Sequence, residues 1–214
     1  MPSSTLTANK RALRAELRRR RRGLSGRTRQ AAAASVLRRA LRAGLLLRYR
    51  RIGFYLSHDG ELDLLPLLNQ ALWLNKHCFL PALPPRFSKR LRFNRIGPSS
   101  RHWRHNRFGI LEHGSPRPVR AWQLDLLFVP LVGFDAHGNR LGMGGGFYDA
   151  SLAHLRQRKA WRRPLLVGVG YACQQVERLP DDPWDIRLDA VLSERQFYRF
   201  GGTTTDTFHA LLAS

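Results

Sequence analysis

The 214-residue sequence predicts an α/β fold: a single domain with a largely parallel sheet, helices on both faces of that sheet, and a basic helix pair at the N-terminus. Two observations predict this class. Short, continuously apolar runs of strand length alternate with segments of helical periodicity, and such runs are typical of strands buried on both faces. The length also suits one core. We expect residues 1–196 to form the domain, and residues 197–214 to form a C-terminal tail that starts with a hairpin strand.

The N-terminal region, residues 5–47, is predicted to form two basic helices. Leucines at helical spacing predict the first helix over residues 5–22, and Gly23 ends it. Residues 27–47, which are rich in Ala, Leu and Arg, predict the second. Residues 18–22 are an unbroken run of arginines, so part of this run must face solvent or an anion.

The remainder of the chain alternates predicted strands and helices. The predicted strands are short apolar runs, which cover residues 52–56, 78–80, 124–130, 165–170 and 190–192. Predicted helices cover residues 62–74 and about 147–159. Pro81 is expected to stop the second strand. Residues 82–122 have weak periodicity and are expected to be mostly loop, with one further strand over residues 90–95.

The net charge of +22 arises from 37 basic and 15 acidic residues, and most of it lies in residues 1–51. Two interpretations stay open. One is an anionic partner, such as nucleic acid, a nucleotide or a substrate with several carboxylates. The other is a solvated surface that is rich in arginine. The charge alone therefore does not decide the function.

Composition excludes several classes of protein. No apolar run approaches the ~18–20 residues that a membrane span needs, and no secretory signal is visible. Cys78 and Cys173 are far apart, which argues against a disulfide framework and a cysteine-rich zinc site. We therefore expect a cytoplasmic protein, and we also expect it to be a monomer.

A glycine-rich loop is the segment most informative about chemistry. Four glycines fall within five residues: Gly142, Gly144, Gly145 and Gly146. They follow Arg140 and precede a predicted helix that starts near Phe147. Backbone N–H groups of such a loop can turn inward and bind phosphate, and Asp149 can hold a divalent cation that bridges phosphates. The spacing matches neither a Walker A loop nor a Rossmann fingerprint, so a tight turn that serves packing alone remains the alternative.

A second polar cluster follows the strand predicted over residues 165–170. Gln174 lies four residues beyond its end, and Asp185 and Asp189 lie further along, near prolines and Trp184. Asp185 could join Asp149 on one metal ion. The spacing alone favours a solvated acidic loop. The eight histidines form no metal-binding spacing.

At these residues a family resemblance appears. The segment FDAHGNRLGMGGGFYD resembles the signature of the 5-formyltetrahydrofolate cyclo-ligase family, also called methenyltetrahydrofolate synthetases. Four further segments resemble the family in order along the chain: KRALRAELRRRRRGLS, RIGFYLSHDGELD, FGILEH and QQVERLPDDPWDIRLDAVLSE. The resemblance covers residues 10–194. It implies an α/β fold and the conversion of 5-formyltetrahydrofolate to 5,10-methenyltetrahydrofolate, which depends on ATP and Mg²⁺ and releases ADP and phosphate.

The resemblance also implies roles for particular residues. The ATP contacts that it implies are Lys10, Arg14, Arg140, Leu141, Gly142, Met143, Gly144, Gly145, Gly146, Phe147 and Tyr148. The folate contacts that it implies are Leu56, Glu61, Phe147, Tyr148 and Gln174. Mg²⁺ would be held by Asp149 and Asp185, with Asp189 as the alternative second ligand. Glu61 would accept hydrogen bonds from the pterin N–H groups, and an aromatic face would stack on the ring.

The partners implied are therefore ATP and 5-formyltetrahydrofolate, with or without a polyglutamate tail. Nucleic acid bound to the basic N-terminal region is the alternative, and it is not favoured. Some positions depart from the family pattern, and His113 stands where proline is usual. Met143 and Gly145 replace basic residues of some members, so their phosphate contacts must come from elsewhere in the chain.

Overall fold

The computed structural model describes residues 4–97, 100–156, 163–180, 182 and 184–200. In this part of the chain a seven-stranded sheet has the order β11-β10-β9-β6-β1-β2-β3. Its strands are β1 Arg51–Gly53, β2 His77–Ala82, β3 Arg92–Ile96, β6 Leu126–Pro130, β9 Leu165–Val169, β10 Ala190–Leu192 and β11 Phe197–Arg199. The inner pairs are parallel, and the edge strands β3 and β11 are antiparallel to their neighbours. The predicted α/β class with a largely parallel sheet is confirmed.

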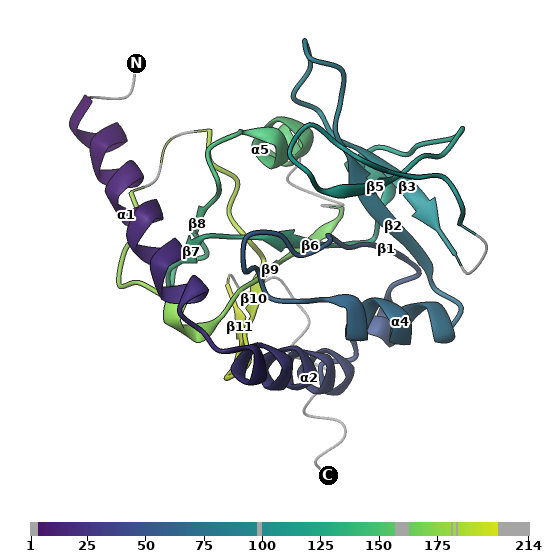
Figure 1. Cartoon of the computed structure of the whole chain (residues 1–214), viewed down its shortest axis with the longest axis horizontal. Helices are drawn as coiled ribbons and strands as arrows, with labels where there is room; N and C mark the ends of the chain where they lie inside the picture. The colour runs from purple at the N-terminus through teal and green to yellow at the C-terminus, as the bar shows by residue number, and fades with distance from the viewer. Residues whose placement is uncertain (1–3, 98–99, 157–162, 181, 183, 201–214) are drawn as a thin grey trace.

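Helices cover both faces of this sheet. The helices are α1 Ser4–Arg22, α2 Gly26–Arg42, α3 Leu45–Arg48, α4 Leu65–Trp73 and α5 Phe147–Leu152, with 3₁₀ turns at η1 Ala121–Gln123, η2 Ala153–Arg156 and η3 Ala172–Gln174. Figure 1 shows α2 and α4 along one face and α5 on the other. Val36 of α2 and Leu67 of α4 share a buried core with Phe54 and Phe128, while Leu152 of α5 belongs to a second core on the opposite face. None of the helices in the described ranges is long and apolar enough to cross a membrane.

The strand order reverses between β1 and β6. The chain passes from β1 through α4 to β2 in one direction, and from β6 through α5 to β9 in the other. In open α/β sheets, ligands bind outside the carboxyl ends of the strands at such a reversal. The fold therefore directs attention to the residues that follow β1 and β6.

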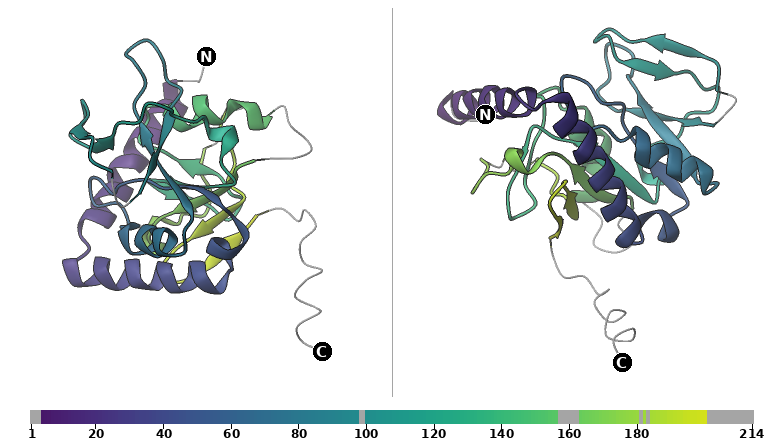
Figure 2. Two further views of the ribbon diagram at one scale, coloured as in Figure 1. Left: turned by 90° about the vertical axis from the view of Figure 1, so that its right-hand side faces the viewer. Right: turned by 60° about the horizontal axis from the view of Figure 1, so that its bottom comes forward.

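Helix α1 lies at one side of the sheet, where it contacts the 3₁₀ turn η3 (Figure 2). It packs on the hairpin of β7 Gly133–Phe134 and β8 Arg140–Leu141. The approach is close at Gly133, where an added Cβ would lie 2.5 Å from Cδ1 of Leu17. This packing brings the basic face of α1 beside the glycine-rich loop.

A two-stranded arm extends beyond β3. It consists of β4 Trp103–His105 and β5 Leu111–His113, which are antiparallel. The buried carboxylate of Glu112 anchors the arm, because its Oε1 accepts hydrogen bonds from Leu83 N at 2.7 Å and from Asn106 Nδ2 at 2.9 Å. The arm lies within residues 82–122, where the sequence predicted mostly loop.

Several predicted boundaries were wrong. Pro81 does not stop β2, because β1 already ends opposite Phe79, and beyond that point a missing N–H costs no bond to β1. The second predicted helix breaks at Gly44, whose φ of 67° is left-handed. No strand was predicted between those over residues 124–130 and 165–170, but the hairpin of β7 and β8 lies there. Of the helix predicted over about residues 147–159, α5 covers the first six residues and the 3₁₀ turn η2 the next four, and the remainder lies outside the described residues.

Other predicted elements begin late or end early. The strand predicted over residues 52–56 ends at Gly53, and the helix predicted over residues 62–74 begins at Leu65. The hairpin strand predicted at the start of the tail is confirmed as β11, which pairs with β10 and so belongs to the sheet. The end of the tail lies outside the described residues.

Candidate active site

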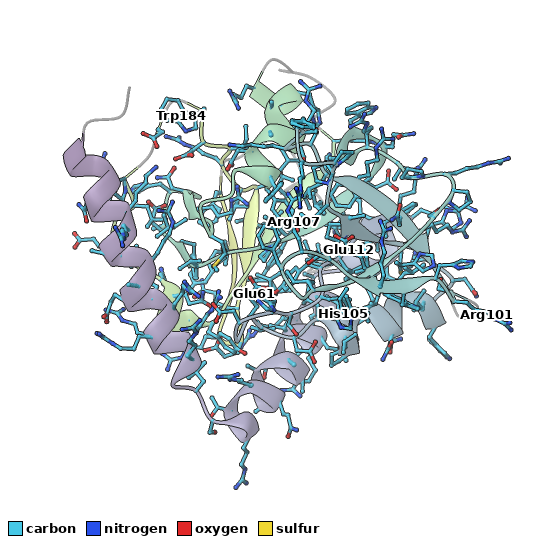
Figure 3. The ribbon with its side chains drawn as sticks, turned by 45° about the horizontal axis from the view of Figure 1, so that its top comes forward. Glu61, Arg101, His105, Arg107, Glu112 and Trp184 are labelled. Atoms are coloured by element: carbon cyan, nitrogen blue, oxygen red, sulfur yellow. The ribbon has the colours of Figure 1, made fainter. Side chains whose placement is uncertain are left out.

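A cavity of about 890 Å³ lies at the reversal of strand order. Tyr55 and Leu56 after β1, Pro81 in β2, and Pro130 and Leu131 at the end of β6 contribute to its lining. Helix α1 and the glycine-rich loop close one side, and the β4–β5 arm closes another. Figure 3 shows Glu61 near the middle of the molecule, with Arg107 and Glu112 on the side of the arm and Trp184 toward the N-terminal half of α1.

One face of α1 supplies cations to this cavity. Lys10 and Arg14 are four residues apart, so they share a helix face as predicted. Lys10 Nζ donates to the carboxylates of Asp182 at 2.6 Å and Asp185 at 3.0 Å. Burial opposes the charge on Lys10, but these two carboxylates outweigh it and raise the pKa of the ammonium group. Arg14 Nε donates to the carbonyl of Gly142 at 2.8 Å.

The glycine-rich loop has the backbone conformation that its glycines permit. Gly144 and Gly146 have φ angles of 97° and 67°, in the left-handed region that other residues rarely adopt. A Cβ at Gly145 would lie 2.8 Å from the ring of Phe147. The guanidinium of Arg14 passes close to Gly144, and the stem of Lys89 passes close to Gly146. Lys89 thus brings a basic side chain from another part of the chain to a loop that contains no basic residue among its glycines.

Arg140 and Asp149 face one another beside this loop. Arg140 Nη2 donates to Asp149 Oδ1 at 2.6 Å, and the guanidinium lies over the ring of Tyr148 at 5.6 Å from its centroid. The Arg140 side chain is buried, whereas the Asp149 carboxylate keeps 28% exposure. Asp149 therefore has oxygen surface available to a further ligand.

Glu61 also lines the cavity. Its Oε2 accepts a hydrogen bond from His58 N at 3.1 Å, and its side chain is only 12% exposed. Burial raises the pKa of Glu61 to about 7, although the nearby charge of Arg21 acts in the opposite direction. Tyr148 lies close to Glu61, and Phe147 contacts Phe108 of the arm edge-on. The structure thus brings a carboxylate and aromatic rings together at one part of the cavity.

The predicted metal ligands are carboxylates, which Mg²⁺ accepts as donors. Within the described ranges, no three His, Cys, Asp or Glu side chains gather in one cluster. Asp149 and Asp185 both line the cavity, and each is paired with a cation. Mg²⁺ is commonly held by one or two carboxylates together with phosphate oxygens and water. This donor set therefore fits a Mg²⁺ ion that arrives with a nucleotide.

Two predicted residues lie outside the cavity lining. Gln174 is buried, and its Nε2 donates to the carbonyls of Leu131 at 3.0 Å and Val132 at 2.8 Å, while its Oε1 accepts from Tyr171 N. Its amide is therefore used by the backbone around the cavity. Asp189 accepts a hydrogen bond from Leu166 N at 2.7 Å, between β9 and β10. The structure brings neither side chain to the site.

Several residues of the cavity were missed by the sequence reasoning. The arm contributes Asn106, Phe108 and Glu112, and weak periodicity gave no signal for it beyond the FGILEH resemblance. Asp59, in the turn after β1, was also given no role from the sequence, although it does not line the cavity. It binds three arginines of α1, which are Arg18, Arg21 and Arg22.

Sheet, cavity and loop together define an α/β enzyme whose ligand site lies at the carboxyl ends of its strands. Comparisons with known proteins are more specific. The sequence model of the 5-formyltetrahydrofolate cyclo-ligase family matches residues 6–194, so the chain belongs to this family. Its activity is that of a 5-formyltetrahydrofolate cyclo-ligase, or 5,10-methenyltetrahydrofolate synthetase.

Relatives in sequence and structure agree with this assignment. The 5-formyltetrahydrofolate cyclo-ligase of Haemophilus influenzae is 39% identical over 189 residues, which cover 87% of this chain and 98% of the relative. The enzyme of the same name from Escherichia coli K12 is 36% identical over 190 residues, 86% of this chain and 100% of the relative. The solution structure of Aquifex aeolicus 5,10-methenyltetrahydrofolate synthetase superimposes with a TM-score of 0.75 at 30% identity, covering 92% of this chain and 96% of that one.

Proposed function

We propose that this cyclo-ligase couples the conversion of 5-formyltetrahydrofolate to the cleavage of ATP into ADP and phosphate, with Mg²⁺ bound. One observation carries the proposal. A single cavity is lined both by cations and backbone suited to an anion, from the glycine-rich loop, Lys10, Arg14 and Arg140, and by the buried acceptor Glu61. A ligand with phosphates and a ligand with a ring of N–H donors can therefore meet in it.

The reaction consists of two displacements. The formyl oxygen of the substrate attacks the γ-phosphorus of ATP, and ADP leaves. N10 of the folate then attacks the activated formyl carbon, and phosphate leaves with the N10 proton as the methenyl bridge closes. Such chemistry needs positioning and neutralised phosphate charge more than covalent help from the protein.

The phosphate end is built from backbone and cations. The α-helix that follows the loop has only six residues, so its dipole adds little, and the N–H groups of the loop with Arg14, Arg140 and Lys89 provide most of the attraction. We expect Lys10 and Arg140 to exchange Asp185 and Asp149 for phosphate oxygens when ATP binds. Mg²⁺, held by Asp149 and Asp185, would neutralise charge that develops on the phosphates.

The folate end is built from Glu61 and apolar surface. Glu61 would accept hydrogen bonds from the pterin N–H groups, and Leu56 and Pro81 would cover the ring. Phe147 and Tyr148 lie between this end and the loop, where an aromatic face can stack on the ring. Gln174 would act indirectly, through the carbonyl of Leu131 that it holds.

Absorbance of the methenyl product tests the proposal directly. Purified protein should form it from 5-formyltetrahydrofolate only when ATP and Mg²⁺ are both present. Product formed without ATP would contradict the proposed coupling, and no product under saturating conditions would contradict the reaction. Nucleic-acid binding by the basic run has less support, because Arg18, Arg21 and Arg22 are already bound to Asp59.

A further inference from the structure

Arg21 is a guanidinium with no exposure to solvent, although it belongs to an arginine run on a surface helix. Arg19, Arg20 and Arg22 are exposed. Arg21 shares a face of α1 with the buried Leu17, because the two are four residues apart. A buried charge is costly unless it is paired and hydrogen-bonded, so the partners of Arg21 indicate its role.

These partners come from both sides of the strand reversal. Arg21 Nε donates to the carbonyl of Asp59 at 3.0 Å and Nη2 to its carboxylate at 2.9 Å, on the turn that follows β1. Nη1 donates to the carbonyl of Leu131 at 3.3 Å, directly after β6. Nη2 also lies 3.9 Å from the sulfur of Met143 in the glycine-rich loop. One side chain therefore joins the turn, the strand end and the loop around the cavity.

Glu61 lies beside this guanidinium and is not neutralised by a close ion pair. Arg21 Nη1 is 4.0 Å from Glu61 Oε1, which is beyond hydrogen-bonding distance. The other oxygen accepts one backbone hydrogen bond, from His58. Glu61 therefore keeps acceptor capacity for a ligand, while the nearby positive charge favours its ionised form.

We infer that Arg21 is a positioning residue, which fixes the turn that carries Asp59 and Glu61 and keeps Glu61 ionised for the folate ring. This inference rests on the proposed function, because it takes Glu61 as the carboxylate that binds folate. It assigns to Arg21 no contact with the substrate or with the reacting atoms.

The charges around Glu61 predict opposite effects for two variants. Burial raises the pKa of Glu61, Arg21 from α1 lowers it, and Asp59 in the same turn raises it. The hydroxyls of Tyr55 after β1 and Tyr148 of α5 also face Glu61, and burial raises the pKa of each, so both are neutral at physiological pH. Removing the charge of Arg21 should therefore favour protonated Glu61, and removing that of Asp59 should favour ionised Glu61.

The protonation of Glu61 can be followed through the Kd for 5-formyltetrahydrofolate, measured by calorimetric titration without ATP between pH 5.5 and 9. For the unaltered chain, the Kd should rise as Glu61 takes up a proton at low pH. Arg21→Met should move the midpoint of that rise upward by about one pH unit, and weaken binding at pH 7.5 about threefold. Arg21→Lys keeps the charge and should restore most of the midpoint. Asp59→Asn should move the midpoint downward.

Arg20→Met is the matched control, because Arg20 is exposed, is bound to Glu16 and lies one residue away. It should leave the midpoint unchanged. A folded Arg21→Met protein with the original midpoint and Kd would overturn the inference. If Arg21→Met does not fold, Asp59→Asn provides the test. The inference would be overturned if Asp59→Asn left the midpoint unchanged or raised it.

Glu61→Gln separates the inference from the proposed function. It should remove the pH dependence of binding. If Glu61→Gln binds folate as the unaltered chain does at every pH, Glu61 is not the folate carboxylate, and both the site assignment and the inference fail. If Glu61→Gln removes the dependence and Arg21→Met does not shift it, only the role of Arg21 is overturned.

Discussion

Asp59 is the anion that holds three arginines of α1 against the turn after β1, and its replacement by Asn should destabilise the protein measurably. Its carboxylate accepts from Arg18 at 2.8 Å and from Arg21 at 2.9 Å, and it also binds Arg22. The Asp59 side chain is only 10% exposed. Asn keeps the shape and one acceptor oxygen, so the variant removes the charge with little change in packing.

The expected loss of folding free energy in Asp59→Asn can be worked out in two ways. The three arginines lower the pKa of Asp59 from 3.8 to about 2, against the effect of burial. At about 1.4 kcal/mol per pKa unit, this shift corresponds to roughly 2 kcal/mol of folding free energy at neutral pH. Removing one partner of a buried ion pair costs roughly 3–5 kcal/mol. Arg21 would keep its bonds to two backbone carbonyls, which reduces this second figure.

Both routes therefore predict a loss of about 2–3 kcal/mol for Asp59→Asn, measured by urea unfolding at pH 7 with circular dichroism and tryptophan fluorescence. Glu16→Gln is the matched control, because Glu16 also binds two arginines but lies on the exposed face of α1. It should leave the free energy of unfolding nearly unchanged.

The pH dependence gives the sign of the effect. A carboxylate whose pKa is lowered in the folded state stabilises above the unfolded value, and this stability is lost as the pH falls through the folded value. The difference between the unaltered protein and Asp59→Asn should thus be full above pH 3.8 and shrink toward pH 2. A difference that stays constant over that range, or no difference at pH 7, would refute the reasoning.

Three further predictions concern the site. Asp149→Ala should lower turnover at least ~100-fold with an unchanged circular dichroism spectrum, because Mg²⁺ loses a ligand; retained turnover across a range of Mg²⁺ would exclude this role. Glu61→Gln should weaken folate binding by roughly 1–3 kcal/mol and leave ATP affinity unchanged. If Glu61 acted through folding, calorimetry would show that the affinities for folate and for ATP fall equally. The double variant Arg19→Gln, Arg20→Gln should raise the KM for polyglutamylated substrate more than the KM for monoglutamate, and this difference should disappear at high salt. If the double variant instead loses tight RNA binding and neither KM changes, the prediction is contradicted.

Some parts of the fold and the site could be predicted because their signals are local. The glycine-rich loop is one of them, since only glycine adopts the φ of 97° at position 144 without strain. The buried strands are another, because continuous apolar runs fit only a sheet covered on both faces. The spacing of Lys10 and Arg14 placed both on one helix face, where the structure has them.

The β4–β5 arm could not be predicted, because long-range contacts hold it. Glu112 accepts a hydrogen bond from Leu83 N, which is 29 residues away, and the sequence around neither residue predicts this contact. Pro81 shows the same limit. A proline normally argues against a central strand, but here the neighbouring strand β1 is shorter, and only the sheet as a whole reveals this.

The arginine run illustrates how composition and structure differ as sources of inference. From the sequence, residues 18–22 needed an anion or solvent, and folate or ATP was the expected anion. The structure provides Asp59, 38 residues from Arg21 along the chain. The run is therefore largely a device that attaches α1 to the sheet, and its excess charge is left for ligands only at the exposed positions.

The pairing of the predicted ligand groups follows the same logic. Lys10 is bound to Asp185, and Arg140 is bound to Asp149, so each cation expected to bind phosphate neutralises a carboxylate expected to bind Mg²⁺. Partly buried charges are costly to leave unpaired. ATP with Mg²⁺ carries both charges at once, so each ion pair can be replaced by a new one, with phosphate on the cation and metal on the carboxylate. At the Arg140–Asp149 pair, either ligand alone would leave one partner unpaired, whereas Lys10 also keeps its bond to Asp182. Because Mg²⁺ and ATP bind each other in solution, a variant is needed to measure the contribution of this pair. We expect Asp149→Asn to tighten the binding of ATP without Mg²⁺, since Arg140 is then free, and to reduce the gain in affinity that Mg²⁺ provides. Calorimetry with ATP alone and with ATP and Mg²⁺ would show neither change if the pair did not open.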